Sequence, residues 1–167
     1  GVLYVSWLLG FLLKIYFFAA PDAVGFDGGY CLLFFILATK CSDIGAYSLG
    51  SLIGRHKMIP RVSPAKTWEG FVGAILLSTT AAIVMAHYWG AARLGGMTLG
   101  HAAALGPVLA VGAVIGDLVE SVFKRDSGVK DSGSFFPGIG GILDLLDSLL
   151  FNAPLMFLYL RLVLFNE

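Results

Sequence analysis

The sequence predicts an all-α fold, a polytopic helical bundle in a membrane with about five transmembrane helices. Hydrophobic residues make up 57% of the 167 residues and charged residues only 13%, whereas about a quarter of a soluble domain is charged. The apolar residues also fall into runs near the roughly 20 residues that a helix needs to cross the hydrocarbon core. These two observations together predict five spans, at 3–20, 29–54, 68–89, 99–123 and 142–165.

The first span, at 3–20, lacks the marks of a cleavable signal peptide, because no basic leader precedes it and no soluble domain follows it. Since the chain opens on Gly1 within an apolar run, we expect residues 1–167 to be one transmembrane domain, the C-terminal part of a longer chain. Cys31 and Cys41 lack metal-site spacing and are expected to be buried thiols.

Basic residues orient the predicted bundle. Seven of the eleven lysines and arginines lie in the connecting segments 55–66 and 124–140, which five spans would put on the same side of the membrane. The segments 21–28 and 90–98, on the other side, hold one basic residue between them. The positive-inside rule therefore predicts that both basic segments face the cytoplasm.

The second span contains the first charge expected at membrane depth. On a helix Asp43, Tyr47, Gly50 and Gly54 lie along one face, and the two glycines would let a neighbouring helix approach closely. Packing does not explain Asp43, because a carboxylate in the membrane is costly unless it meets a cation or a water-filled cavity. Asp43 is therefore a candidate site residue.

The basic segment before the third span supplies candidate phosphate contacts. Ser63 or Thr67 can cap the following helix with Glu69 in its first turn, and capping alone explains these three residues. Lys66 is different, since a lysine beside a helix N-terminus opposes the helix dipole. An anion such as phosphate, held jointly by Lys66 and free backbone N–H groups, explains it better.

The end of the fourth span places several polar groups on one helix face. Asp117, Glu120, Ser121 and Lys124 are spaced i, i+3, i+4 and i+7. A Glu120–Lys124 ion pair accounts for two of them and leaves Asp117 unexplained.

Two further aspartates begin the fifth span. Asp144 and Asp147 are spaced i, i+3, and with Asp117 and Asp43 they would form an acidic cluster near the cytoplasmic boundary. Carboxylates that close together need a cation between them. Because the three histidines are scattered, the oxygen ligands favour magnesium over zinc, with a second cation left open. Magnesium in turn suggests polyphosphate chemistry.

The segment from Ser121 to Asp147 resembles the signature of the phosphatidate cytidylyltransferase (CDP-diacylglycerol synthase) family. The matching residues are Ser121, Lys124, Arg125, Lys130, Asp131, Pro137, Gly140, Gly141, Asp144 and Asp147. Upstream, "DIGAYSLGSLIGRHK" followed by "SPAKTWEG" is similar to the other recurring segment of the family. The signature segments are thus 43–70 and 117–148. Family members commonly have histidine where this chain has Ile139 and arginine where it has Leu145, two side chains that cannot contact nucleotide or phosphate through polar groups.

The resemblance implies a nucleotidyltransferase that transfers CMP from CTP to phosphatidate, giving CDP-diacylglycerol and pyrophosphate in phospholipid biosynthesis. The expected partners are CTP, phosphatidate in the bilayer and membrane lipid, with no nucleic acid and with a homodimer left open. The expected location is a bacterial inner membrane, with the active site facing the cytoplasm. The residues assigned to catalysis are Lys124, Arg125, Lys130 and Asp131; to substrate binding Ser63, Lys66, Thr67, Ser121, Gly140 and Gly141; and to Mg²⁺ Asp43, Asp117, Asp144 and Asp147.

Two other classes of function compete with this interpretation. One is a CTP-dependent enzyme acting on another lipid phosphate or a polyprenol, such as an ether-lipid CDP-synthase or a polyprenol kinase. The other is an ion-coupled transporter, whose carboxylates should line a path at mid-membrane and recur in related halves of the chain. The gathering of the carboxylates beside basic segments at one face argues against a transporter.

Overall fold

The computed structural model describes residues 2–18, 25–60, 62–126 and 142–165, and of residues 2–5, 126 and 142–145 it describes the backbone alone. Within this part of the chain the elements are α1 (Val2–Tyr16), α2 (Gly28–Ile53), β1 (Lys57–Ile59), β2 (Ser63–Thr67), α3 (Trp68–Arg93), α4 (Leu99–Asp126), α5 (Ile142–Tyr159) and the π-helical turn η1 (Leu160–Leu164). The predicted helical fold is confirmed.

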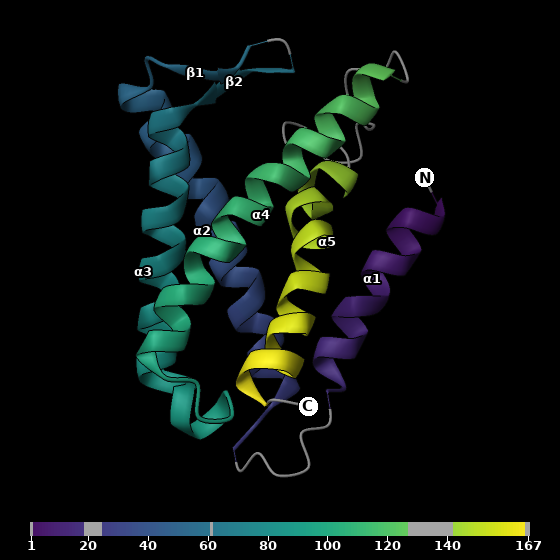
Figure 1. The fold of residues 1–167 in the computed structure, drawn as a ribbon, viewed down its shortest axis with the longest axis vertical. Helices are drawn as coiled ribbons and strands as arrows, with labels where there is room; N and C mark the ends of the chain where they lie inside the picture. The colour runs from purple at the N-terminus through teal and green to yellow at the C-terminus, as the bar shows by residue number, and fades with distance from the viewer. Residues whose placement is uncertain (1, 19–24, 61, 127–141, 166–167) are drawn as a thin grey trace.

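The helices form an up-and-down bundle in which consecutive helices pack side by side (Figure 1). Helix α1 closes the bundle by packing against α5 and α2. Four described helices, α2 to α5 with its η1 extension, are long and apolar enough to cross a membrane. The predicted first span corresponds to α1, which ends at Tyr16 rather than at residue 20 and is shorter than the other four. The chain is therefore a polytopic helical membrane protein.

The core combines aromatic residues with glycines that bring the helices close together. Phe34 and Phe35 of α2 are completely buried. A Cβ atom on Gly45 would collide with the backbone of Gly73, so α2 and α3 approach closely only because both residues lack side chains. Cys31 is buried as predicted, whereas Cys41 is half-buried because neighbouring helices cover that position of α2 only in part.

The basic segment 55–66, predicted as a loop, contains a short antiparallel ribbon of β1 and β2. The Val62 N–H donates to the Ile59 carbonyl oxygen at 3.1 Å, with Pro60 at the turn position that its fixed φ favours. The Trp68 N–H donates to the His56 carbonyl oxygen at 3.0 Å and joins the ribbon to the start of α3. Such short strands show too little alternation to be recognised from sequence.

The ribbon, the C-terminal end of α4 and the N-terminal end of α5 lie at the same end of the bundle, which we call the site end (Figure 1). At the opposite end Asp27 caps α2 by accepting a 2.9 Å hydrogen bond from the Gly29 N–H. Arg93, at the end of α3, lies 3.7 Å from the Asp27 carboxylate and over the ring of Tyr30. The segments 55–66 and 124–140, both predicted to face the cytoplasm, thus adjoin helix ends that lie at the site end.

Candidate functional site

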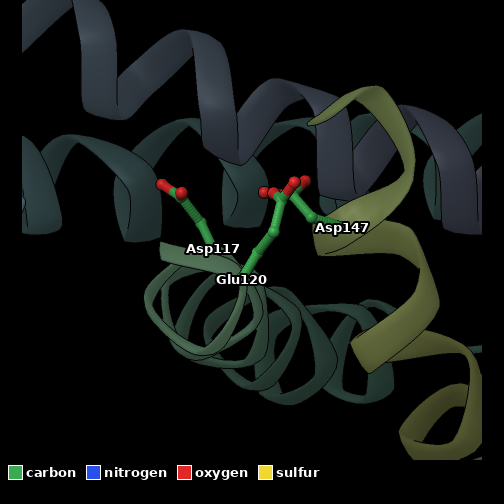
Figure 2. Close-up of side chains that lie close together, drawn as sticks. All are labelled: Asp117, Glu120 and Asp147. Carbon is green, nitrogen blue, oxygen red and sulfur yellow. The ribbon is translucent and has the colours of Figure 1, made fainter. Parts of the chain in front are cut away.

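Three carboxylates from two helices meet at the site end. Asp117 and Glu120 project from α4, and Asp147 projects toward them from α5 (Figure 2). One oxygen of each lies within 4.8 Å of the others. The structure thus brings together two of the predicted metal ligands, Asp117 and Asp147, and adds Glu120, which the sequence interpretation had assigned only to an ion pair.

A glycine on α4 permits this meeting of helices. A Cβ atom on Gly116 would lie 2.9 Å from the Phe151 Cβ, closer than real Cβ contacts allow, and 3.0 Å from the Asp147 carbonyl oxygen, closer than most of them. The absence of a side chain at Gly116 lets α5 approach α4 immediately beside Asp117. Backbone packing therefore sets the distance between the Asp117 and Asp147 carboxylates.

Two lysines contact the cluster. Lys66 of the ribbon places its Nζ 2.8 Å from the Asp117 carboxylate and donates at 2.9 Å to the Val114 carbonyl oxygen. Lys124 lies 3.0 Å from the Glu120 carboxylate, one helical turn away on α4. Both lysines are largely buried, with 16% and 24% of their side chains exposed, so they are screened less from the carboxylates than surface lysines would be.

These groups line a cavity of about 590 Å³, a volume typical of small-molecule sites. Its walls come from both signature segments and from α2, the ribbon, α3, α4 and α5. Four carboxylates and three lysines line it: Asp43, Asp117, Glu120, Asp147, Lys40, Lys66 and Lys124. A polar, charged hollow at one end of an apolar bundle can hold an anionic molecule together with a cation.

Asp43 lines this cavity but, among the described residues, lies outside the three-carboxylate cluster. Its carboxylate lies 3.0 Å from Lys40 Nζ and accepts a hydrogen bond from the Ser148 hydroxyl at 3.1 Å. Its predicted role as a metal ligand therefore stays a prediction.

The remaining predicted residues fall into three groups. Ser63 and Thr67 line the cavity, and the buried Thr67 hydroxyl accepts from the Gly70 N–H at 3.2 Å, which makes Thr67 the N-cap of α3. Ser121 is half-buried and Arg125 exposed on the last turns of α4. The predicted residues Lys130, Asp131, Gly140 and Gly141, with Ile139, lie outside the described residues, as do the side chains of Asp144 and Leu145.

Sequence reasoning missed Glu120 as a cluster member and Lys40 as a lining residue. The i, i+3 spacing of Asp117 and Glu120 was a usable signal for Glu120, but an ion pair with Lys124 was a sufficient explanation of the residue in the sequence alone. That ion pair does form, and the same carboxylate still reaches the cluster. Lys40 precedes Asp43 by three residues, a spacing that predicts a local ion pair and nothing about a cavity.

Fold and site together define an integral membrane protein with a charged cavity at one end of a helical bundle. The model of the cytidylyltransferase family matches residues 1–163, nearly the whole chain. The chain therefore belongs to the cytidylyltransferase family.

Several curated relatives are phosphatidate cytidylyltransferases of bacteria. The chain is 41% identical to that of Mycobacterium leprae over 146 residues, covering 87% of this chain and 45% of the relative. It is 40% identical to that of Staphylococcus haemolyticus over 156 residues, covering 93% and 55%. For Haemophilus influenzae the identity is 37% over 129 residues, covering 77% and 45%. The chain thus spans about half the length of the curated relatives it matches.

Proposed function

We propose that the protein is a phosphatidate cytidylyltransferase, which transfers CMP from CTP to phosphatidate and forms CDP-diacylglycerol and pyrophosphate. The observation that carries the proposal is the meeting of Asp117, Glu120 and Asp147 with Lys66 and Lys124 in one cavity at the site end. Membership of the cytidylyltransferase family and the names of the relatives support the same reaction.

The reaction needs positioning and charge neutralisation more than proton transfer. An oxygen of the phosphatidate phosphate attacks the α-phosphorus of CTP and forms a new P–O bond. The bond from the α-phosphorus to the bridging oxygen breaks, and pyrophosphate leaves with the electron pair. Because the attacking phosphate is already anionic, no strong general base is required, and fixed charges can provide most of the catalysis.

The three-carboxylate cluster fits a magnesium ion. Its donors are all hard oxygens, and three carboxylates within 4.8 Å of one another repel unless a cation or proton lies among them. Asp117, Glu120 and Asp147 would hold this ion, with Asp144 a further predicted ligand. Bound magnesium would neutralise charge developing on the transferred phosphoryl group and on pyrophosphate.

Two of the cavity lysines, Lys66 and Lys124, are suited to bind phosphate. Lys66 and Lys124 contact the carboxylates of Asp117 and Glu120, which would bind the cation. When the cation and substrate bind, each lysine would then leave its carboxylate and bind a phosphate oxygen of the substrate. Arg125, Lys130 and Asp131 extend this set as predictions from the family signature. Ser63, Ser121 and the backbone N–H groups of Gly140 and Gly141 are predicted to contact substrate as well.

We propose that the site faces the cytoplasm of a bacterial cell from its inner membrane. Basic residues concentrate in the segments 55–66 and 124–140, which connect helices whose described ends lie at the site end, as the positive-inside rule requires of cytoplasmic segments. CTP would enter from the cytoplasm, and the phosphatidate headgroup would reach the cavity from the bilayer surface.

Purified protein supplied with labelled CTP, Mg²⁺ and phosphatidate tests the proposal. We expect a CDP-lipid and pyrophosphate in equal amounts. No product under conditions in which a related enzyme is active would reject the proposal. Parallel reactions with an ether-lipid phosphate and with a polyprenol identify the competing CTP-dependent functions, since one of these acceptors would then be used in preference to phosphatidate.

A further inference from the structure

Lys40, Asp43 and Ser148 are hydrogen-bonded to one another and join α2 to α5. Lys40 Nζ donates to the Asp43 carboxylate at 3.0 Å and to the Ser148 hydroxyl oxygen at 3.2 Å. The Ser148 hydroxyl in turn donates to the Asp43 carboxylate at 3.1 Å. We call these three residues the α2–α5 triad. Ser148 is almost completely buried, with 1% of its surface exposed, so its hydroxyl depends on these partners.

The triad is adjacent to the cluster through the backbone of α5. Ser148 directly follows Asp147, and its backbone N–H donates to the Asp147 carboxylate. Contacts that hold Ser148 against α2 therefore also fix the position of Asp147, whose carboxylate points at Asp117 and Glu120.

A second contact fixes the same face of α5 one turn further on. The fully buried Asn152 side chain donates to the Leu109 carbonyl oxygen at 2.8 Å and to the Thr39 hydroxyl at 3.4 Å. These contacts keep α5 against α4 and α2 but lie deeper in the bundle than Asp147. The α2–α5 triad is thus a polar contact between described residues that fixes α5 at the level of the cluster.

We propose that the α2–α5 triad is a positioning device that holds the Asp147 carboxylate in reach of Asp117 and Glu120 and so sets the affinity of the site for a divalent cation. The proposal deepens the proposed function and rests on its cation site. In this role Lys40, Asp43 and Ser148 are positioning residues, and Asp43 acts through Ser148 rather than as a ligand. Groups that orient ligands in this way commonly change metal affinity by about 10- to 100-fold when they are removed.

Lys40 allows a test by the sign of the effect. A lysine that affected the site only through its charge would repel a bound cation, so its removal would tighten cation binding. A lysine that positions Asp147 has the opposite effect, and its removal weakens binding. Ser148 carries no charge, so any weakening on loss of its hydroxyl comes from geometry.

The experiment measures Mn²⁺ binding to the whole purified polypeptide in detergent, without nucleotide, from the electron paramagnetic resonance signal of free Mn²⁺. We expect Lys40→Met and Ser148→Ala each to weaken Mn²⁺ binding about tenfold. Lys40→Arg, which retains the charge and several N–H donors, restores binding to within about twofold of wild type. Lys14→Met, the same change in α1 where the ammonium lies over the Phe11 ring, leaves binding unchanged.

Several results would overturn the proposal. Tighter or unchanged binding in Lys40→Met, in a variant that elutes as a single species with an unchanged melting temperature, would show that Lys40 does not position Asp147. Wild-type binding in Ser148→Ala would do the same, even where Lys40→Met fails to fold. Wild-type protein that binds no Mn²⁺ also rejects it.

The same variants separate this proposal from the proposed reaction. Mn²⁺ binding is measured without CTP or lipid, so an absent CDP-lipid product together with the expected binding changes rejects the reaction and keeps the triad. A formed product together with unchanged binding in the variants rejects the triad and keeps the reaction. In active protein, the Mg²⁺ concentration for half-maximal rate should rise about tenfold in Lys40→Met, while KM for CTP at saturating Mg²⁺ stays within about twofold.

Discussion

Glu120 distinguishes two interpretations of the charged face of α4. If its carboxylate only pairs with Lys124, its loss removes one ion pair and little else. If it is a cation ligand, its loss removes charge from a cluster in which it lies within 4.8 Å of Asp117 and Asp147. Only 10% of its side chain is exposed, which favours the second interpretation, because a carboxylate that buried needs more than one partner.

We expect Glu120→Gln and Asp147→Asn each to lower kcat about 100-fold or more, because each removes a negative charge that would hold the cation. The half-saturating Mg²⁺ concentration should rise as well. Initial rates of CDP-lipid formation against Mg²⁺ concentration measure both. Glu69→Gln is the matched control, since Glu69 lies at the same end but bonds His56 at 2.7 Å, and its rates should stay near those of wild type. Near-normal rates in Glu120→Gln would show that Glu120 only forms an ion pair with Lys124 and does not bind the cation.

Lys66 and Lys57 belong to the same ribbon but differ in environment. Lys66 is largely buried against Asp117, whereas Lys57 is exposed on β1. We expect Lys66→Met to lower kcat/KM for CTP about 100-fold and Lys57→Met to change it less than about threefold, because charge-assisted bonds to phosphate are strong only where water is excluded. Steady-state kinetics with CTP as the varied substrate measure both. Equal losses in the two variants would show that the ribbon acts only through its total charge.

The limits of sequence reasoning are clearest for pairs of side chains on different helices. Asp117 and Asp147 were assigned to one cluster because each follows a helical spacing near the same membrane boundary, and the structure brings them together. The contact of Lys40 with Ser148 joins residues 108 positions apart. It depends on how α2 and α5 are rotated about their axes, and one sequence does not fix that rotation.

At the scale of elements, two of the helices predicted from long apolar runs also begin at a residue that caps them. The spans predicted at 29–54 and 68–89 correspond to α2 at Gly28–Ile53 and α3 at Trp68–Arg93. Asp27 and Thr67 cap these two helices through side-chain oxygens, which fixes their starts. The ribbon was missed because its strands have only three and five residues, one of them interrupted by Pro64.

The contact between α4 and α5 predicts a strong effect of a single methyl group at Gly116. In Gly116→Ala the new Cβ would lie 2.9 Å from the Phe151 Cβ and 3.0 Å from the Asp147 carbonyl oxygen, so α5 must shift. We expect a loss of about 1–3 kcal/mol in stability, as for other overpacked cores, and a higher half-saturating Mg²⁺ concentration because Asp147 moves. Thermal unfolding in detergent and Mg²⁺-dependent rates are the measurements.

Gly100→Ala provides the control on the same helix. A Cβ at Gly100 would meet only the Thr98 hydroxyl oxygen at 3.6 Å, an ordinary contact, and alanine favours helix over glycine by about 1 kcal/mol. Its melting temperature should therefore equal or exceed that of wild type. An unchanged melting temperature and Mg²⁺ dependence in Gly116→Ala would contradict the view that helix approach at this glycine positions Asp147.

On the scale of the whole molecule, the charged cavity and the two segments rich in basic residues belong to the same end of the bundle. The cavity and its lysines lie at the site end, while Arg93 and Asp27 form an exposed ion pair at the opposite end. This arrangement was predictable, because alternating connections of a helical bundle must lie on alternating sides. The positive-inside rule predicts that the site end faces the cytoplasm, and this prediction can be tested directly.

Two alanine-to-cysteine variants test the orientation, in a background where Cys31 and Cys41 are replaced by alanine. Ala65 is exposed on the ribbon at the site end, and Ala92 is exposed in the last turn of α3 at the opposite end. A maleimide that cannot cross membranes should label Ala65→Cys in inside-out vesicles and Ala92→Cys in right-side-out vesicles. CTP is made and kept in the cytoplasm, so the reverse pattern would leave the cavity on a side without its nucleotide and would contradict the proposed reaction as well as the orientation.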